Sequence, residues 1–208
     1  MEYSFYTIVL VAITALVSLW AFKDRNVYAH LILYPHTMRN AAEYHRFLTH
    51  GFIHADEQHL IFNMIALYSI GSYVEGFYAL MGVHHLYLLL YLSGIVVASL
   101  PSFIKHRNNP HYASLGASGG TAAVLFSMVY LAPWEKFSLF FFIPMWAIVF
   151  AVLYLVYSAY MTGKQRDNVA HDAHFMGAIY GFLFTYLCDP LHGQIFIQQI
   201  LHPPFLNP

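Results

Sequence analysis

The sequence is dominated by segments that are long enough to cross a lipid bilayer and carry almost no charge. A helix needs about 20 mostly apolar residues to span the hydrocarbon core. Such segments lie at about residues 3–22, 58–80, 84–104, 117–134, 137–161 and 173–188. Backbone groups in lipid must find their hydrogen bonds within the protein, and segments of this length do so as helices. We therefore expect an all-α integral membrane protein, a single domain over residues 1–208 folded as a six-transmembrane-helix bundle.

The composition supports a lipid environment and argues against a nucleic-acid partner. Hydrophobic residues make up 59% of the chain and charged residues 9%, whereas soluble domains carry about 25% charged residues. The formal net charge is −1 and no basic tract is present, so nothing favours nucleic-acid binding. The single cysteine, Cys188, excludes an intrachain disulfide and a cysteine-based zinc site. The first span lacks a preceding Lys or Arg and a small-residue cleavage site, so we expect a retained helix.

A serine stands among small residues where the fourth span begins, in the run Gly116-Ala117-Ser118-Gly119-Gly120. Small neighbours let another helix approach closely and leave the hydroxyl and nearby backbone N–H groups accessible. The run fits the G-x-S-x-G pattern of soluble hydrolases, but that pattern needs a preceding strand, and here a polar loop precedes it. By itself the run also fits a packing face between membrane helices.

A histidine opens the sixth span, followed by glycines at helical spacing. His174, Gly177 and Gly181 fall on one helix face. The glycines would let a neighbouring helix come into contact, and His174 would point into that contact. If the neighbour is the fourth span, His174 could serve as the base that a serine nucleophile requires. The alternative is a histidine that is hydrogen-bonded between helices.

A third polar cluster precedes and enters the second span. His59 and Asn63 are four residues apart, so they share a helix face, and both can donate hydrogen bonds to a developing oxyanion. His50 and His54 lie just before them, where they could organise the loop. Alone, the cluster also fits a hydrogen-bonded group at the membrane surface.

Together the three clusters resemble the rhomboid family of intramembrane serine proteases, in particular its bacterial six-span members. The GxSG, AHxxGxxxG and HxxxN motifs of that family occur in the expected order and spans, and the preceding histidines also fit. The matching residues are Gly116, Ser118, Gly119, Ala173, His174, Gly177, Gly181, His59, Asn63, His50 and His54. The chain departs from the family at two places. His45-Arg46 stands where Trp-Arg is frequent, and Ala122 replaces an aromatic residue that many members stack on the catalytic histidine.

The resemblance implies a rhomboid-like fold and hydrolysis of peptide bonds in or beside transmembrane segments of substrate proteins. Ser118 would be the nucleophile and His174 its base, with His59, Asn63 and the Ser118 N–H around the oxyanion. Asp172 lies two residues from His174, on another helix face, so we expect a Ser-His dyad without a carboxylate. No metal or other cofactor is implied.

Two other functions are compatible with parts of the sequence. The chain has 14 histidines, and His50/His54 and His171/His174 have ligand-like spacings, as in a histidine-box membrane metalloenzyme. However, the pair His84-His85 has no such box before it, and H-E-x-x-H is absent. Inactive relatives of rhomboids bind transmembrane clients without cutting them, but they generally lack the serine or the histidine.

The charge distribution and the resemblance disagree on orientation. Eight of the nine Lys and Arg residues lie in the first, third and fifth loops, which the positive-inside rule would place in the cytoplasm. Bacterial six-span rhomboids usually have the N-terminus inside, and we follow the resemblance, which also implies a bacterial inner (plasma) membrane. The active site opens on the odd-loop side in either case. We expect the tail after residue 190 to be a short interfacial segment; the sequence leaves the oligomeric state open.

Overall fold

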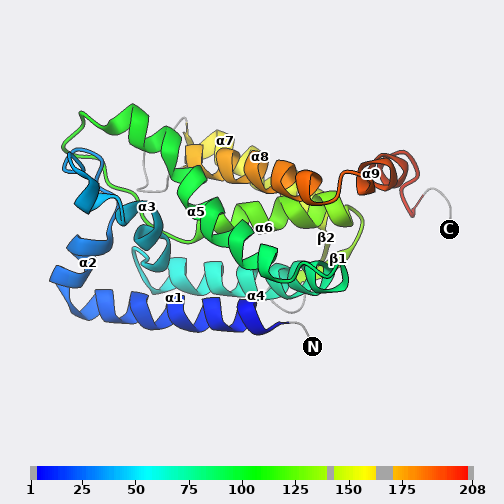
Figure 1. The fold of residues 1–208 in the computed structure, drawn as a ribbon, viewed down its shortest axis with the longest axis horizontal. Helices are drawn as coiled ribbons and strands as arrows, with labels where there is room; N and C mark the ends of the chain where they lie inside the picture. Colours follow the sequence, from blue (N-terminus) through cyan, green and yellow to red (C-terminus); the bar gives the residue numbers. More distant parts are fainter. Residues whose placement is uncertain (1–3, 140–142, 163–170, 206–208) are drawn as a thin grey trace.

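The computed structural model describes residues 4–139, 143–162 and 171–205, and it confirms a mostly helical membrane protein. The longer helices of the bundle (Figure 1) are α1 (Phe5–Lys23), α4 (Glu57–Leu80), α5 (His85–His106), α6 (Ser118–Leu131), α7 (Ala147–Thr162) and α8 (His171–Cys188). Within the described part, α1, α4 and α5 are long and apolar enough to cross a membrane, while α6 and residues 147–160 are shorter apolar helices.

Helix α6 is the centre of the bundle. Of its 14 residues, 12 are buried, and α4, α5, α7 and α8 all pack against it. Gly119, Gly120, Ala122 and Ala123 keep its first turns narrow, so that the surrounding helices approach its backbone. At 1.5 Å per residue the helix is about 21 Å long, shorter than the roughly 30 Å hydrocarbon core. The helix is therefore too short to span that core by itself, and Ser118 is its first residue.

The first loop is folded and covers the end of the bundle at which α6 begins (Figure 1). It contains α2 (Arg25–Leu31), η1 (Ala41–Glu43), α3 (Arg46–Thr49) and η2 (His50–Phe52). Leu33 forms an antiparallel bridge with Ser114, through N···O distances of 3.1 and 2.9 Å. The first loop is thereby attached to the segment that leads into α6.

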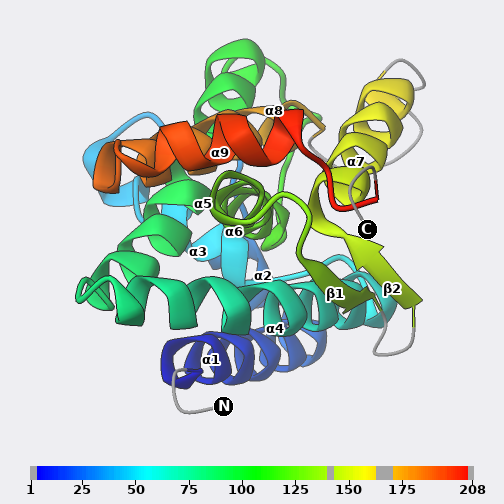
Figure 2. The same cartoon turned by 90° about the vertical axis from the view of Figure 1, so that its right-hand side faces the viewer.

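The fifth span starts later than the sequence indicated. We expected a helix over 137–161, but α7 begins at Ala147, and the preceding residues form a hairpin of β1 (Lys136–Leu139) and β2 (Ile143–Trp146). Figure 2 shows the hairpin beside the start of α7. Pro144 gives the physical reason, because proline lacks the N–H that a helix interior needs. Lys136 lies 5.1 Å from the centre of the Trp146 ring across the two strands.

The last described helix is the short α9 (His192–Leu201), which lies at the same end of the molecule as the start of α1 (Figure 1). It exposes Ile195, Ile197 and Leu201, while His192 is buried. Apolar side chains exposed on a short helix are typical of a segment at a membrane surface, which agrees with the expected interfacial tail. The first loop and the start of α6 lie at the opposite end of the molecule.

Candidate active site

Ser118 is the first residue of α6, and the conformation of the turn before it depends on a glycine. Gly116 has a φ of +112°, in the region that disfavours side chains, and a Cβ atom there would lie 2.9 Å from Cε1 of His59. Ala117 and Gly119 are buried, whereas Ser118 is partly exposed. The first N–H groups of a helix have no intrahelical acceptor and carry the positive end of its dipole, so this turn can bind a developing anion.

His54 connects this serine turn to α1. Its Nε2 accepts a hydrogen bond from the Ala117 N–H at 3.3 Å, which means that Nδ1 carries the ring proton. Nδ1 lies 2.9 Å from Oγ of Ser18, and this hydroxyl in turn donates to the Phe52 carbonyl at 2.9 Å. All three hydrogen bonds have consistent donors and acceptors when His54 is neutral. Burial lowers the pKa of His54 to about 3, which keeps the ring in that state.

His50 supports the same turn through its backbone. Its carbonyl accepts the N–H of Gly116 at 2.9 Å, and its Nδ1 lies 2.8 Å from the Arg46 carbonyl. Burial lowers the pKa of His50 to about 4. The two histidines before the second span therefore both hydrogen-bond with the turn that precedes Ser118.

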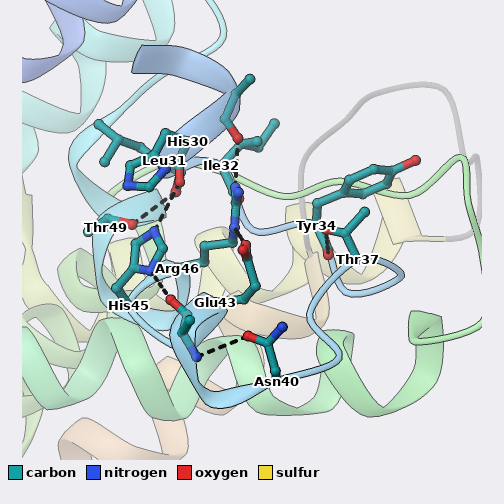
Figure 3. Close-up of polar contacts among 12 residues, drawn as sticks. His30, Leu31, Ile32, Tyr34, Thr37, Asn40, Glu43, His45, Arg46 and Thr49 are labelled. Carbon is teal, nitrogen blue, oxygen red and sulfur yellow. Dashed lines mark hydrogen bonds and ion pairs between the residues drawn. The ribbon is translucent and has the colours of Figure 1, made fainter. Parts of the chain in front are cut away.

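Arg46 fixes the first loop itself (Figure 3). Its Nη1 donates to the carbonyls of Ala29 and Ile32 at 2.7 and 2.8 Å, and its Nε pairs with the Glu43 carboxylate. This guanidinium lowers the pKa of Glu43 through a hydrogen bond and its charge. Arg46 thus links the end of α2 to η1.

His45 occupies the position at which the resemblance led us to expect tryptophan. Its ring stacks on His30, with centroids 4.6 Å apart. Nδ1 lies 2.8 Å from the Ala42 carbonyl and Nε2 lies 3.1 Å from the His30 carbonyl; Figure 3 shows both contacts. The histidine therefore packs flat against the end of α2 and makes polar contacts with the loop backbone.

The glycine spacing predicted a close contact with a neighbouring helix, and in the structure that neighbour is α6, the fourth span. A Cβ atom at Gly177 would lie 2.4 Å from the Gly119 carbonyl oxygen, and one at Gly181 would lie 2.0 Å from that of Ala123. Only glycine permits this approach of two backbones. Because His174 precedes Gly177 by one turn, the packing brings it to the start of α6.

Ser118, His174, His59 and Asn63 line one cavity of about 320 Å³. His59 is placed by Asp56, whose side chain accepts the His59 N–H at 2.7 Å and caps α4. The Asn63 amide donates one hydrogen bond to the His59 carbonyl at 2.9 Å, and an asparagine amide has a second donor. The structure thus brings into one cavity the four residues of the second, fourth and sixth spans that the sequence singled out.

Two residues of α7 that contact His174, Tyr154 and Ser158, were not predicted from the sequence. Oγ of Ser158 lies 2.9 Å from Nδ1 of His174, and the Tyr154 ring lies against the imidazole, with centroids 4.9 Å apart. A hydroxyl inside an apolar span was the available signal for Ser158. Asp172 instead pairs with Lys105 at 2.9 Å, on another side of α8.

The structure gives no geometric support to a histidine-box metal site. Among the residues it describes, no three His, Cys, Asp or Glu side chains come together as a metal ion would require. His50 and His54, which have ligand-like spacing, instead form hydrogen bonds with the protein backbone and with Ser18.

Comparison with known proteins shows which family the chain belongs to. The Rhomboid domain matches residues 41–190. The chain is 28% identical to Rhomboid-related protein 1 of Caenorhabditis elegans over 68% of its length, and 28% identical to the mitochondrial RHOMBOID-like protein 12 of Arabidopsis thaliana over 64%. It is 31% identical to Rhomboid protease GluP of Bacillus subtilis over 67%. These matches span only 39%, 43% and 25% of the relatives' own lengths. With the domain matched over most of its length, the chain belongs to the rhomboid family.

Proposed function

We propose that this protein is an intramembrane serine endopeptidase that cleaves peptide bonds in or beside transmembrane segments of membrane proteins. The observation that carries the proposal is the shared cavity of Ser118 and His174 at the start of a short, buried helix. His59 and Asn63 line the same cavity, where they supply donors for an oxyanion.

The reaction follows from the roles of these groups. Ser118 Oγ attacks the scissile carbonyl carbon, and His174 Nε2 takes the hydroxyl proton. The tetrahedral oxyanion accepts hydrogen bonds from His59, Asn63 and the Ser118 N–H. As the peptide C–N bond breaks, His174 passes its proton to the leaving amine and an acyl-enzyme remains. A water molecule, deprotonated by His174, then hydrolyses the ester. The steps balance without a metal or other cofactor.

The cavity wall indicates the substrate class. Besides the four polar groups, it is lined mainly by apolar and aromatic side chains, including Phe62, Ile70, Leu125, Phe150 and Tyr157. Since α6 is shorter than the hydrocarbon core, we place Ser118 below the membrane surface, where a substrate would present its scissile bond. A transmembrane protein segment that can unwind locally fits these conditions.

The membrane setting is part of the same proposal. We assign the protein to a bacterial plasma membrane, with its termini in the cytoplasm, on the basis of its likeness to bacterial six-span rhomboids. Both termini lie at the end of the molecule opposite the start of α6 (Figure 1), so one reporter fused to the C-terminus fixes the orientation. A cytoplasm-active reporter should function there, whereas activity of an export-dependent reporter would reverse the assignment.

The decisive experiment combines cleavage with active-site labelling. Purified protein in liposomes is given a transmembrane reporter substrate and, separately, a serine-reactive phosphonate probe. We expect the wild type to cleave and to be labelled, and Ser118→Ala and His174→Ala to lose cleavage while remaining folded. Ser138→Ala, which changes an exposed serine of β1, is the matched control and should behave as wild type. A wild-type protein that is neither labelled nor active would indicate a non-catalytic client-binding protein.

A further inference from the structure

The imidazole of His174 is held from one side by two residues of α7. Oγ of Ser158 lies 2.9 Å from Nδ1, and the Tyr154 ring lies against the imidazole at a centroid distance of 4.9 Å and an interplanar angle of 31°. The two residues are four positions apart, so they share one face of the helix. Ser158 is fully buried and His174 is 6% exposed. The contact is therefore an interior one.

We propose that Ser158 and Tyr154 are the positioning residues for the base His174, with Ser158 setting its tautomer; this rests on the proposed protease function. A neutral imidazole carries one N–H. If Nε2 is to take the Ser118 proton, Nδ1 must carry that hydrogen, and the Ser158 oxygen is placed to accept it. In serine proteases with a triad, a carboxylate fills this place. Here a neutral hydroxyl fills it, and Asp172 is bound to Lys105 instead.

Tyr154 replaces the aromatic residue that the fourth span lacks. Ala122 stands at the position from which many rhomboids cover the histidine, and it is 1% exposed. Gly177 of α8 lies close to Ala122, since a Cβ atom at Gly177 would lie 3.2 Å from the Ala122 Cβ. The ring that covers His174 comes instead from Tyr154 of α7.

The position of the base His174 depends on α7, a helix with a large exposed face. Val152, Leu153 and Val156 of α7 are 53–62% exposed, while the opposite face carries Tyr154 and Ser158. A displacement of α7 from α8 would remove the hydrogen bond and the stacked ring together. The orientation of His174 therefore depends on the packing of α7 against α8.

The test measures kcat and KM separately for a transmembrane reporter in liposomes. We expect Ser158→Ala to lower kcat about 10- to 100-fold with KM within about twofold, because an N–H left without its acceptor costs about 1–3 kcal/mol and about 1.4 kcal/mol is tenfold in rate. Ser158→Thr keeps the hydroxyl and should recover most of kcat. Tyr154→Ala should lower kcat about tenfold or more.

Two further variants separate positioning from stability. Tyr154→Phe keeps the ring and removes a hydroxyl that, within the described residues, is buried without a hydrogen-bond partner, so it should recover most of the kcat that Tyr154→Ala loses. Val156→Ala trims the exposed face of the same helix and should leave kcat unchanged. The thermal unfolding midpoint is measured for every variant. If kcat falls only in proportion to the unfolding midpoint, in Val156→Ala as well as in Ser158→Ala, the positioning role is wrong.

The outcomes also separate this inference from the proposed function. If the wild type cleaves, Ser118→Ala does not, and Ser158→Ala and Tyr154→Ala keep wild-type kcat, the positioning role is wrong and the protease function stands. If the wild type neither cleaves nor reacts with the phosphonate probe, both proposals fail.

Discussion

Gly181 of α8 lies against the backbone of Ala123 in α6, so closely that a Cβ atom at position 181 would fall 2.0 Å from the Ala123 carbonyl oxygen. A backbone oxygen in a buried helix cannot move aside as a flexible side chain can. Any side chain at position 181 must therefore separate the two helices that carry His174 and Ser118. The helix contact and the proposed catalytic geometry therefore depend on the same glycine.

We expect Gly181→Ala to lower the free energy of unfolding by about 1–3 kcal/mol, the range typical of overpacking, and to abolish most cleavage activity. The matched control is Gly76→Ala in α4, because a Cβ atom at Gly76 would have no neighbour within 4 Å. Thermal unfolding in detergent and the liposome assay check both effects. Equal stability and activity in the two variants would contradict the close approach.

Glu75 is the one acidic residue in the second span, and the structure gives it a stabilising role. Its carboxylate accepts the N–H groups of Tyr6 and Thr7, at 2.8 and 2.7 Å, and lies 2.8 Å from Nε2 of His84. It therefore caps the first turn of α1, whose N–H groups have no intrahelical acceptor.

Replacing this carboxylate should loosen α1. We expect Glu75→Gln to lower the free energy of unfolding by about 1–3 kcal/mol, because one oxygen is lost and an amide N–H faces the donors of α1. Glu57→Gln, which changes an exposed acid at the start of the same helix, should have little effect. Hydrogen exchange adds a local readout: residues 5–9 should exchange faster in Glu75→Gln alone. Unchanged exchange there would refute the capping role.

Much of the fold and the core of the site could be predicted from sequence because the signals are periodic or compositional. Apolar length indicated the helices, and the spacing of His174, Gly177 and Gly181 indicated a close contact with a neighbouring helix. His59 and Asn63 were found because both are polar and share one helix face. These features depend on local sequence patterns and on the need to satisfy backbone hydrogen bonds in lipid. Both can be recognised in a single sequence.

The remaining parts depend on contacts between distant residues. The start of α7 was misplaced because the apolar run continues through the hairpin, and composition cannot separate a strand from a helix there. Ser158 and Tyr154 are ordinary residues of a membrane helix until α7 packs beside α8. The link from Ser18 through His54 to Ala117 joins three separate segments, so no local pattern contains it.

Acid should destabilise the protein through His50 and His54. Both are buried, and burial lowers their pKa values to about 4 and about 3, against about 6.5 in an unfolded chain. Below pH 6.5 the unfolded chain binds protons that the folded protein does not. The contribution of the two neutral histidines to the free energy of unfolding is thus complete above pH 6.5. It is lost as the pH falls toward 4 for His50 and toward 3 for His54, by up to about 1.4 kcal/mol per pH unit for each histidine.

The unfolding midpoint in detergent, measured from pH 8 to pH 4, checks this dependence. We expect it to be nearly constant above pH 7 and to fall increasingly below pH 6. His54→Gln should be less stable at pH 8, because Ala117 loses its acceptor, and should show a shallower fall with acid. His111→Gln, at an exposed histidine, should follow the wild type. A midpoint that stays level down to pH 4 would contradict the burial of neutral histidines.

Asp172 tests whether the base works without a carboxylate. It is two residues before His174, and its carboxylate lies 2.9 Å from Nζ of Lys105, in an ion pair that is partly exposed. Exposed pairs of this kind contribute about 0–1 kcal/mol. We therefore expect Asp172→Asn to keep kcat within about twofold of wild type and to change stability little, with Lys105→Gln as the matched partner variant and His174→Ala as the inactive reference. In a triad with a carboxylate, the corresponding Asp-to-Asn change lowers kcat about 10⁴-fold. A loss of that order in Asp172→Asn, with Lys105→Gln unaffected, would replace the dyad by a triad and remove the need for Ser158 at Nδ1.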